Sequence, residues 1–328
     1  MILVVGGAGY IGSHTVKVLI KNRYNVIVYD NLSTGHREFV NNVLFEYGDL
    51  SHKEKLDEVF KKYKIDAVIH FAASAYVGES VTNPNLYYRN NICNGLNLLE
   101  CMRENNVYNI VFSSSCATYG LPENLPITEQ SPQNPISPYG MTKYVFERIL
   151  SDFQRAYGFN FVSLRYFNAA GASTDGELGE WHTPETHVIP LILECVNDKN
   201  KEFKIFGTDY PTRDGSCIRD YIHVDDLADA HMKTINYLTK PQHINYFNLG
   251  TGYGCSVIEL VKTVENKTET KINVQHCEKR EGDPPELIAS YELANKEFNW
   301  EPKHSSIDNI VLTAWNWYKK LNSTLYKK

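Results

Sequence analysis

The chain of 328 residues predicts an α/β fold, a doubly wound parallel sheet with a second, smaller α/β lobe. Two observations lead to this prediction. Short apolar runs rich in β-branched residues alternate with segments of helical periodicity through the first half of the chain. A glycine-rich turn also follows the first apolar run directly and opens the first helical segment. At roughly 150 residues per domain, the length fits about two domains or one large unit with an appendage.

The expected strands are short and often flanked by turn residues, and they cover residues 2–5, 25–29, 67–71, 109–113 and 161–165. Between them, apolar residues at three- and four-residue spacing predict helices over residues 14–21, 53–63, 88–105 and 139–157. Because strands and helices alternate strictly, consecutive strands should run in parallel within one sheet.

The composition excludes several classes of protein. The 33 Lys and Arg against 39 Asp and Glu give a formal charge of −6, which argues against a nucleic-acid or anionic-membrane partner. With 42% hydrophobic residues, the chain is globular rather than disordered. No segment approaches the roughly 18 apolar residues of a membrane span, and no signal peptide is indicated. The 7 cysteines form no CxxC pair, so we expect free thiols in the cytoplasm.

Residues 6–12 read GGAGYIG, and their glycines fit both GxxGxxG and GxGxxG spacing. In either register, glycine allows a tight turn and lets backbone N–H groups approach a pyrophosphate at a helix N-terminus. A glycine-rich turn without a ligand is the alternative interpretation. The location between strand and helix, followed by an acid after the second strand, favours a dinucleotide and a Rossmann-type domain.

That acid is Asp30, which closes the second expected strand. A carboxylate there can accept hydrogen bonds from the adenosine ribose and repels a 2′-phosphate, so NAD is favoured over NADP. Arg37 keeps NADP open as an alternative. Asp49 lies where the adenine amino group could find an acceptor, although a plain turn aspartate explains it nearly as well.

A candidate catalytic pair opens the helix expected after Ser137 and Pro138. Tyr139 and Lys143 lie four positions apart and therefore share one helix face, where the ammonium can stabilise the phenolate and lower its pKa. The alternative is a solvated helix face. Ser115 ends a serine run at the carboxyl end of the fourth strand, where it could contact the same substrate oxygen.

The fragments GGAGYIGSH, VIHFAA, VGES, FSSS, SPYG, RYFNAAGA, IFGTDYPTRDG, RDYIHVDDLADAH and REGDPP follow one another over nearly the whole chain. Through them the sequence resembles the extended short-chain dehydrogenases/reductases and, within that superfamily, the NAD-dependent 4-epimerases of UDP-hexoses. The resemblance implies an isomerase that inverts C4 of UDP-galactose or UDP-glucose through a transient 4-keto sugar and NADH. It also implies a homodimer, formed through helices such as 88–105 and 139–157.

The resemblance also implies roles for individual residues. Tyr139 would take the proton from the sugar C4 hydroxyl, Ser115 would orient or relay it, and Lys143 would bind the nicotinamide ribose. The implied NAD contacts are Gly6, Gly9, Tyr10, Ile11, Gly12, Asp30, Asn31, Asp49, Leu50, Phe71, Ala72, Ala73, Asn90, Lys143, Tyr166 and Phe167. The implied UDP-sugar contacts are Ser115, Tyr139, Asn168, His187, Phe206, Arg219, Tyr221, Val257, Arg280, Asp283 and Leu287.

On this interpretation the chain divides into two lobes. Residues 1–168 form the NAD-binding domain, to which the chain returns around residues 213–247. Residues 169–212 and 248–328 form the lobe that holds the nucleotide sugar.

Three positions near the sugar depart from the best-known bacterial pattern. Ala75 replaces a lysine, His187 stands where an asparagine pair often lies, and Leu287 replaces a tyrosine that closes the pocket against N-acetyl groups. Leucine is shorter and has no hydroxyl. We therefore hypothesise that UDP-N-acetylglucosamine and UDP-N-acetylgalactosamine are also substrates.

Other functions fit the residues less well. A dehydratase of this fold would carry Thr-Asp-Glu where the chain has Ser115, Cys116 and Ala117. A decarboxylase would need additional basic groups around a sugar carboxylate, and none is evident. A non-catalytic dinucleotide sensor would be expected to lose Tyr139 or Lys143. The 11 histidines form no HExxH or Cys/His ligand spacing, so no metal is expected.

Overall fold

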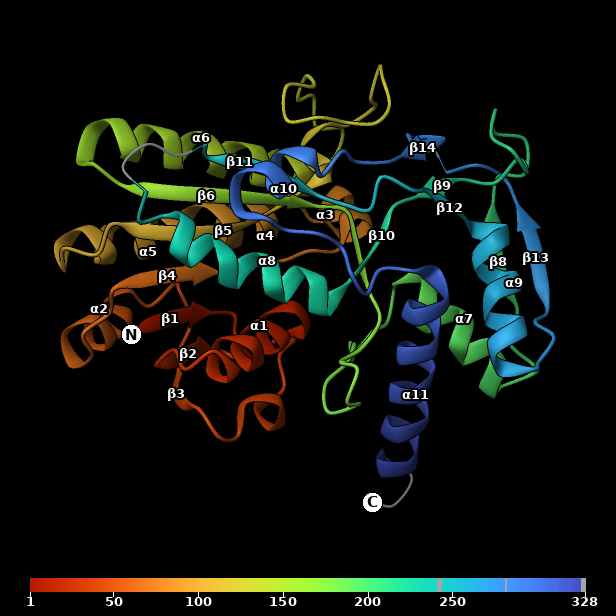
Figure 1. Cartoon of the computed structure of the whole chain (residues 1–328), viewed down its shortest axis with the longest axis horizontal. Helices are drawn as coiled ribbons and strands as arrows, with labels where there is room; N and C mark the ends of the chain where they lie inside the picture. The colour runs from red at the N-terminus through yellow and green to blue at the C-terminus, as the bar shows by residue number, and fades with distance from the viewer. Residues whose placement is uncertain (241–243, 281, 326–328) are drawn as a thin grey trace.

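A seven-stranded parallel sheet forms the larger lobe of the computed structural model, which describes residues 1–240, 244–280 and 282–325 (Figure 1). The strand order is β11-β6-β5-β4-β1-β2-β3, so the predicted doubly wound sheet is confirmed. The strands are β1 (Ile2–Val5), β2 (Val26–Asp30), β3 (Leu44–Tyr47), β4 (Ala67–His70), β5 (Asn109–Ser115), β6 (Asn160–Tyr166) and β11 (Tyr246–Leu249).

Helices cover both faces of this sheet, and each face has its own apolar core. On one face, α1 (Tyr10–Lys21) packs beside α8 (Val224–Tyr237) and α10 (Glu292–Phe298). On the other face lie α2 (Lys53–Lys62), α5 (Asn94–Glu104) and α6 (Pro138–Tyr157). Since both faces are buried, the central strands read as continuous apolar runs, as the sequence indicated.

Three expectations for the larger lobe need correction. The first helix begins at Tyr10 rather than at residue 14, because the glycine loop passes into it directly. Strand β3 was not predicted, because its four residues form a half-exposed sheet edge without a clear apolar pattern. Residues 88–105 are not one α-helix: η2 (Tyr88–Cys93) is a π-helix between α4 (Pro84–Tyr87) and α5.

The smaller lobe has a separate core between helices and short sheets. Its helices are α7 (Val188–Asn197), α9 (Val257–Thr268) and α11 (Ile307–Leu325). Its strands are β8 (Phe203–Phe206), β9 (Ile218–Arg219), β12 (Cys255–Ser256), β13 (Val274–Cys277) and β14 (Glu286–Leu287). The start of α9 is set by a capping box, in which Ser256 and Glu259 satisfy each other's backbone N–H groups.

Short elements join the lobes. β7 (Asn168–Ala170) continues from β6 and pairs in parallel with β10 (Tyr221–His223), which leads back into α8. The remaining short helices are η1 (Arg37–Val40), α3 (Val77–Thr82) and η3 (Cys116–Thr118). All seven cysteines are free thiols. Among the residues that the structure describes, no helix combines the length and apolarity needed to cross a membrane.

A buried ion pair links α6 to the sheet. The guanidinium of Arg165, the penultimate residue of β6, donates to both carboxylate oxygens of Glu147 on α6, at 2.9 and 2.6 Å. Their side chains are only 3% and 1% exposed. Ser114 Oγ, on β5, donates to the same carboxylate at 2.6 Å, and Arg165 Nη1 donates to Tyr119 Oη at 2.9 Å. Every charge in the group therefore has a partner, as a buried charge requires.

Removing one member of this pair should destabilise the fold strongly. In Arg165→Met, the Glu147 carboxylate stays buried without its cation, and we expect a loss of about 3–5 kcal/mol in the free energy of unfolding. Urea denaturation followed by circular dichroism measures the loss.

Arg155→Met is the matched control, because Arg155 pairs with Asp152 at the surface, where both side chains are more than half exposed. That change should cost no more than about 1 kcal/mol. Equal losses in the two variants would contradict the importance assigned to the buried pair.

Candidate active site

The candidate residues gather where the parallel strands end (Figure 1). β1 leads into the glycine loop, β4 leads into residues 71–73, β5 ends at Ser115, and β6 ends at Tyr166. The carboxyl ends of parallel strands lie at one edge of the sheet, where doubly wound folds open a crevice for ligands. The order of the strands thus brings together residues that lie far apart in the sequence.

The glycine loop has the backbone geometry that a dinucleotide requires. Gly6 has φ +77°, and a β-carbon there would lie 2.5 Å from the backbone nitrogen of Ala72. Gly9 is the N-cap of α1 and has no side chain to cover the first amide groups of the helix. A β-carbon at Gly9 would meet only Gly6 O, at 3.4 Å. The loop therefore fits a pyrophosphate held by the helix N-terminus.

The two candidate acids lie beside this loop. Asp30 accepts hydrogen bonds from the backbone nitrogens of Ala8 at 2.9 Å and Leu32 at 2.8 Å. Burial raises the pKa of Asp30, while these two N–H groups act in the opposite direction. Asp49 accepts from Asn31 Nδ2 at 2.5 Å and from the Ser51 nitrogen at 2.7 Å. Both carboxylates are thus fixed in place, and that of Asp49 also stabilises the turn that contains it, through the Ser51 nitrogen.

Other candidate cofactor contacts are held by the protein around them. Tyr10 Oη donates to Gly171 O at 2.6 Å, so its side chain ties the loop to β7. Asn90 lies in the π-helix and donates to Ser74 Oγ at 3.1 Å. The Phe71 ring lies 4.6 Å from that of His231. The remaining candidates lie in the first turn of α1 or within three residues after the ends of β3, β4 and β6: Ile11, Gly12, Leu50, Ala72, Ala73 and Phe167.

The start of α6 is placed against the end of β5. Ser137 caps the helix by accepting from the Gly140 nitrogen at 3.1 Å. A β-carbon at Gly140 would lie 2.4 Å from Ala117 O, so only glycine allows the helix to approach the turn after Ser115 this closely. Tyr139 and Ser115, both more than nine-tenths buried, are brought together by this contact.

The electrostatics of the pair differ from the expectation. Lys143 Nζ donates to Ser113 O at 2.6 Å and lies 5.9 Å from the centre of the Tyr139 ring. Burial lowers the pKa of Lys143 to about 7, against the opposing effect of Glu147. The pKa of Tyr139 is raised by burial and by Tyr166, although the Ser115 hydroxyl lowers it. The expected depression of the tyrosine pKa is therefore wrong for the protein alone, because burial favours the neutral form of each group.

Tyr166 is fixed next to this pair. Its hydroxyl shares a short hydrogen bond with Ser113 Oγ. Ser113 thus contacts Lys143 through its carbonyl and Tyr166 through its side chain. The serine run of β5 has three functions in succession: Ser113 positions Lys143, Ser114 bonds Glu147, and Ser115 faces Tyr139.

A second group of candidates meets in the smaller lobe. Arg219 Nη2 donates to Asp283 at 3.0 Å, and the Arg280 guanidinium lies 3.9 Å from the centre of the Phe206 ring. Leu287 pairs in register with Arg219 between β14 and β9. Arg280 lies over the Phe206 ring, while Arg219 is held by Asp283, so the group offers an aromatic face for a base and two cations for a diphosphate.

The last substrate candidates lie at the junction of the lobes. Asn168, His187 and Tyr221 line one small hollow together with Glu180 and residues 188–190. Val257, the first residue of α9, follows Ser256 in the same lobe. His187 does not act alone, because its ring is paired with two carboxylates, those of Glu180 and Glu185.

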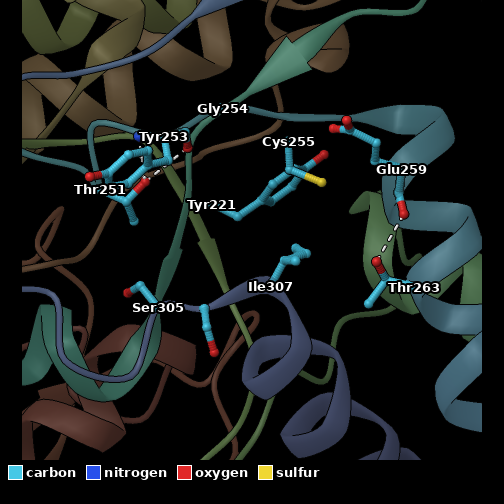
Figure 2. Close-up of a pocket in the computed structure, with 10 residues that line it drawn as sticks. Tyr221, Thr251, Tyr253, Gly254, Cys255, Glu259, Thr263, Ser305 and Ile307 are labelled. Atoms are coloured by element: carbon cyan, nitrogen blue, oxygen red, sulfur yellow. Dashed lines mark hydrogen bonds between the residues drawn. The ribbon is translucent and has the colours of Figure 1, made fainter. Parts of the chain in front are cut away.

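A larger pocket of about 500 Å³ opens between the starts of α9 and α11 (Figure 2). Its lining includes Cys255 and Glu259 on one side and Ser305 and Ile307 on the other. It shares Tyr221 alone with the candidate substrate contacts. This pocket thus lies beside the candidate site rather than in it, and we assign it no role in the chemistry.

Two groupings were missed from the sequence. The pair of Glu147 and Arg165 could have been noticed, because Arg165 is the one charged residue in its strand and Glu147 follows Lys143 by one helical turn. The second grouping, of Glu180, Glu185 and two histidines, comes from an irregular loop. Its spacing matches no familiar ligand motif, so no such signal was available.

The chain matches known proteins over nearly its full length. The sequence model of the NAD dependent epimerase/dehydratase family matches residues 2–250. The UDP-glucose 4-epimerase of Rhizobium meliloti is 48% identical over 321 residues, which cover 98% of both chains.

Solved structures agree with this match. The UDP-glucose 4-epimerase of Brucella ovis, crystallised with NAD, is 48% identical, with a TM-score of 0.94 and coverage of 97% of this chain and 98% of that chain. The UDP-Glc/GlcNAc 4-epimerase of Campylobacter jejuni is 40% identical, with a TM-score of 0.86 and coverage of 97% and 99%. The sequence, the fold and the glycine loop of the present chain together show that it belongs to the NAD-dependent epimerase/dehydratase family.

Proposed function

We infer that the protein is an NAD-dependent epimerase that inverts C4 of a UDP-hexose and so interconverts UDP-galactose and UDP-glucose. The observation that carries this inference is the meeting of Tyr139, Lys143 and Ser115 at the strand edge beside the glycine loop. The activity of relatives with 48% identity over nearly the full chain supports the same reaction.

Tyr139 is the proposed acid and base. Its phenolic oxygen takes the proton of the sugar C4 hydroxyl and later returns it, and Ser115 orients that hydroxyl. Because burial raises the pKa of Tyr139, the phenolate needs a cation nearby. Lys143, in its protonated form, is the cation that α6 supplies one turn further on.

Bound NAD would supply a hydride acceptor for the sugar C4 and, once reduced, a hydride donor to the opposite face of the same carbon. The groups proposed to hold it are the amides of the glycine loop, the Asp30 carboxylate and the Lys143 ammonium. In the proposed division, residues 1–168 and 213–247 form the NAD-binding lobe, and residues 169–212 and 248–328 form the nucleotide-sugar lobe. Two short elements cross this boundary, because β9 with Arg219 pairs in the smaller lobe and α10 packs beside α8 and β11 of the larger lobe. The return of the chain to the large sheet at β11 supports this division.

The UDP group is proposed to anchor the sugar while the reacting ring turns over. Arg219 and Arg280 would bind the diphosphate through charge-assisted hydrogen bonds, with Phe206 beside the base. An anchor outside the reacting ring leaves C4 free to present either face. Because the UDP anchor lies apart from the cofactor site, the sugar ring can turn over while UDP stays bound. One hydride site can therefore serve both epimers.

We also propose a cytoplasmic homodimer. Support comes from the exposed apolar side chains of Val77, Val81, Leu86 and Tyr88, which lie on α3, α4 and η2 next to α6. Such a patch is typical of an interface between protein chains.

Tyr139→Phe tests the proposed chemistry. Removing the phenolic oxygen removes the proton acceptor, so kcat on UDP-galactose should fall by at least about 10²-fold. NAD should remain bound, because the glycine loop is unchanged. Turnover is measured by the UDP-glucose formed, and bound NAD by its release on denaturation.

Tyr144→Phe is the matched control, because Tyr144 lies on the same helix outside the candidate site. It should keep nearly full activity. A Tyr139→Phe enzyme as active as this control would rule out Tyr139 as the base.

The hypothesis of N-acetylated substrates depends on Leu287. Leu287 is partly buried and packs against the cluster that contains Phe167 and Tyr119, next to the catalytic end of β5. A relative at 40% identity is a UDP-Glc/GlcNAc 4-epimerase, which supports a site of this size.

The purified protein should therefore convert UDP-N-acetylgalactosamine as well as UDP-galactose. Leu287→Tyr should lower kcat/KM for the acetylated sugar at least about tenfold more than for UDP-galactose, because the larger ring fills the acetyl space. Leu287→Met, of similar volume, is the control and should change neither ratio greatly. Undetectable turnover of the acetylated sugar by the wild type would refute the hypothesis.

A further inference from the structure

Four side chains that can ligate a metal converge in the loop before α7. Glu180, His182, Glu185 and His187 are spaced E-x-H-x-x-E-x-H along the chain. One ligand atom from each lies within 4.8 Å of the other three. None of the catalytic steps above uses His182 or Glu185.

The distances between these atoms suit a four-coordinate ion. His187 Nδ1 lies 2.9 Å from Glu180 Oε1 and 2.8 Å from Glu185 Oε1. His182 Nδ1 lies 3.5 Å from Glu180 Oε1 and 3.7 Å from Glu185 Oε2. In a tetrahedral site with bonds of about 2.0–2.1 Å, ligand atoms lie about 3.4 Å apart. One ligand atom from each residue already lies within 4.8 Å of the other three, so side-chain shifts of about 1 Å would bring them toward that spacing.

The hydrogen bonds within the group are incomplete. Glu180 and Glu185 are only 7% and 10% exposed, so two carboxylates share one largely dry space. The proton of His187 Nδ1 has two carboxylate oxygens competing for it. His182 Nδ1 is buried without a hydrogen-bond partner, and so is Tyr76 Oη, whose ring lies 6.2 Å from each of the two imidazoles. Buried polar atoms without a partner are uncommon and call for an explanation.

We propose that Glu180, His182, Glu185 and His187 bind one divalent transition-metal ion, of which Zn²⁺ suits the donor set best. Two imidazoles and two carboxylates are ordinary zinc ligands, and the two carboxylates balance the charge of the ion. Four protein ligands leave no open position, which is the pattern of a structural zinc site rather than a catalytic one.

The ion would fix a loop that touches both lobes. Trp181, between two of the ligands, stacks on His36 at 3.8 Å and accepts a hydrogen bond from its Nε2 at 2.9 Å. Trp317 Nε1, on α11, donates to Glu180 O at 2.9 Å. Glu180 and His187 also line the hollow that contains Asn168. The metal would therefore stiffen one wall of this hollow and engage His187, itself a candidate substrate contact, without entering the hydride chemistry.

Metal content of the untagged protein tests the proposal. The protein is incubated with Zn²⁺, freed of excess by gel filtration and measured by inductively coupled plasma mass spectrometry. We expect about one Zn²⁺ per chain, reduced at least tenfold in His182→Ala and in Glu185→Gln. His276→Ala, which removes an exposed histidine on β13, is the matched control and should retain the ion.

Co²⁺ provides a second measurement that depends on geometry and not on the variants. The wild type should develop the intense visible absorption of tetrahedral Co²⁺, which added Zn²⁺ should abolish. Zn²⁺ should also raise the midpoint of thermal unfolding of the wild type but not of His182→Ala.

A wild type that takes up no more than a trace of Zn²⁺ and shows no tetrahedral Co²⁺ spectrum would overturn the proposal, leaving two protonated histidines paired with two carboxylates. Equal uptake by His182→Ala and wild type would overturn it too. If the variants fail to fold, the Co²⁺ spectrum of the wild type decides. None of these measurements depends on epimerase activity, so the two proposals can fail separately.

Discussion

The buried ion pair between Glu147 and Arg165 determines where α6 lies on the sheet. It holds the helix across β5 and β6, because Ser114 and Arg165 from those strands bond the same carboxylate. Lys143 and Tyr139 precede Glu147 by about one and two helical turns, so the pair also sets their height above the strand ends. Tyr119, which accepts from Arg165 and donates to Asn248 at 2.7 Å, extends the constraint to β11. The positions of Tyr139 and Lys143 thus depend on a buried polar network whose members are not among the candidate substrate contacts.

Burial shifts the pKa values of the candidate catalytic pair, Tyr139 and Lys143, in opposite directions. It raises the pKa of Tyr139 and lowers that of Lys143 to about 7, so burial shifts both groups toward their neutral forms. A neutral tyrosine can act as a base only after it becomes a phenolate, and a nearby cation favours that form. Proton removal by Tyr139 therefore depends on the protonation of Lys143 and on the charge that arrives with the bound ligands. The same dry environment keeps water away from a reactive keto sugar.

Much of the larger lobe could be predicted, because the residue patterns that indicate its strands, helices and glycine loop lie within short segments of the chain. The central strands are buried on both faces and read as apolar runs. The glycine loop follows from the spacing of glycines between β1 and α1, and the pairing of Tyr139 with Lys143 follows from their four-residue spacing on α6. Features set by distant contacts could not be predicted. The π-helix holds Asn91, whose amide bonds Thr142 on α6 at 3.0 Å, and the cluster around His182 forms only when a loop folds on itself. The shifted pKa values depend on burial that no spacing reveals.

In the proposed reaction, hydride leaves the sugar C4 for a cofactor that stays bound and then returns to the same carbon. The most direct test is to incubate the purified protein, without added NAD, with UDP-galactose carrying deuterium at C4, and to locate the label in the product by nuclear magnetic resonance. We expect UDP-glucose that retains deuterium at C4, with no exchange against solvent. Loss of the label to water, or no UDP-glucose at all, would contradict it.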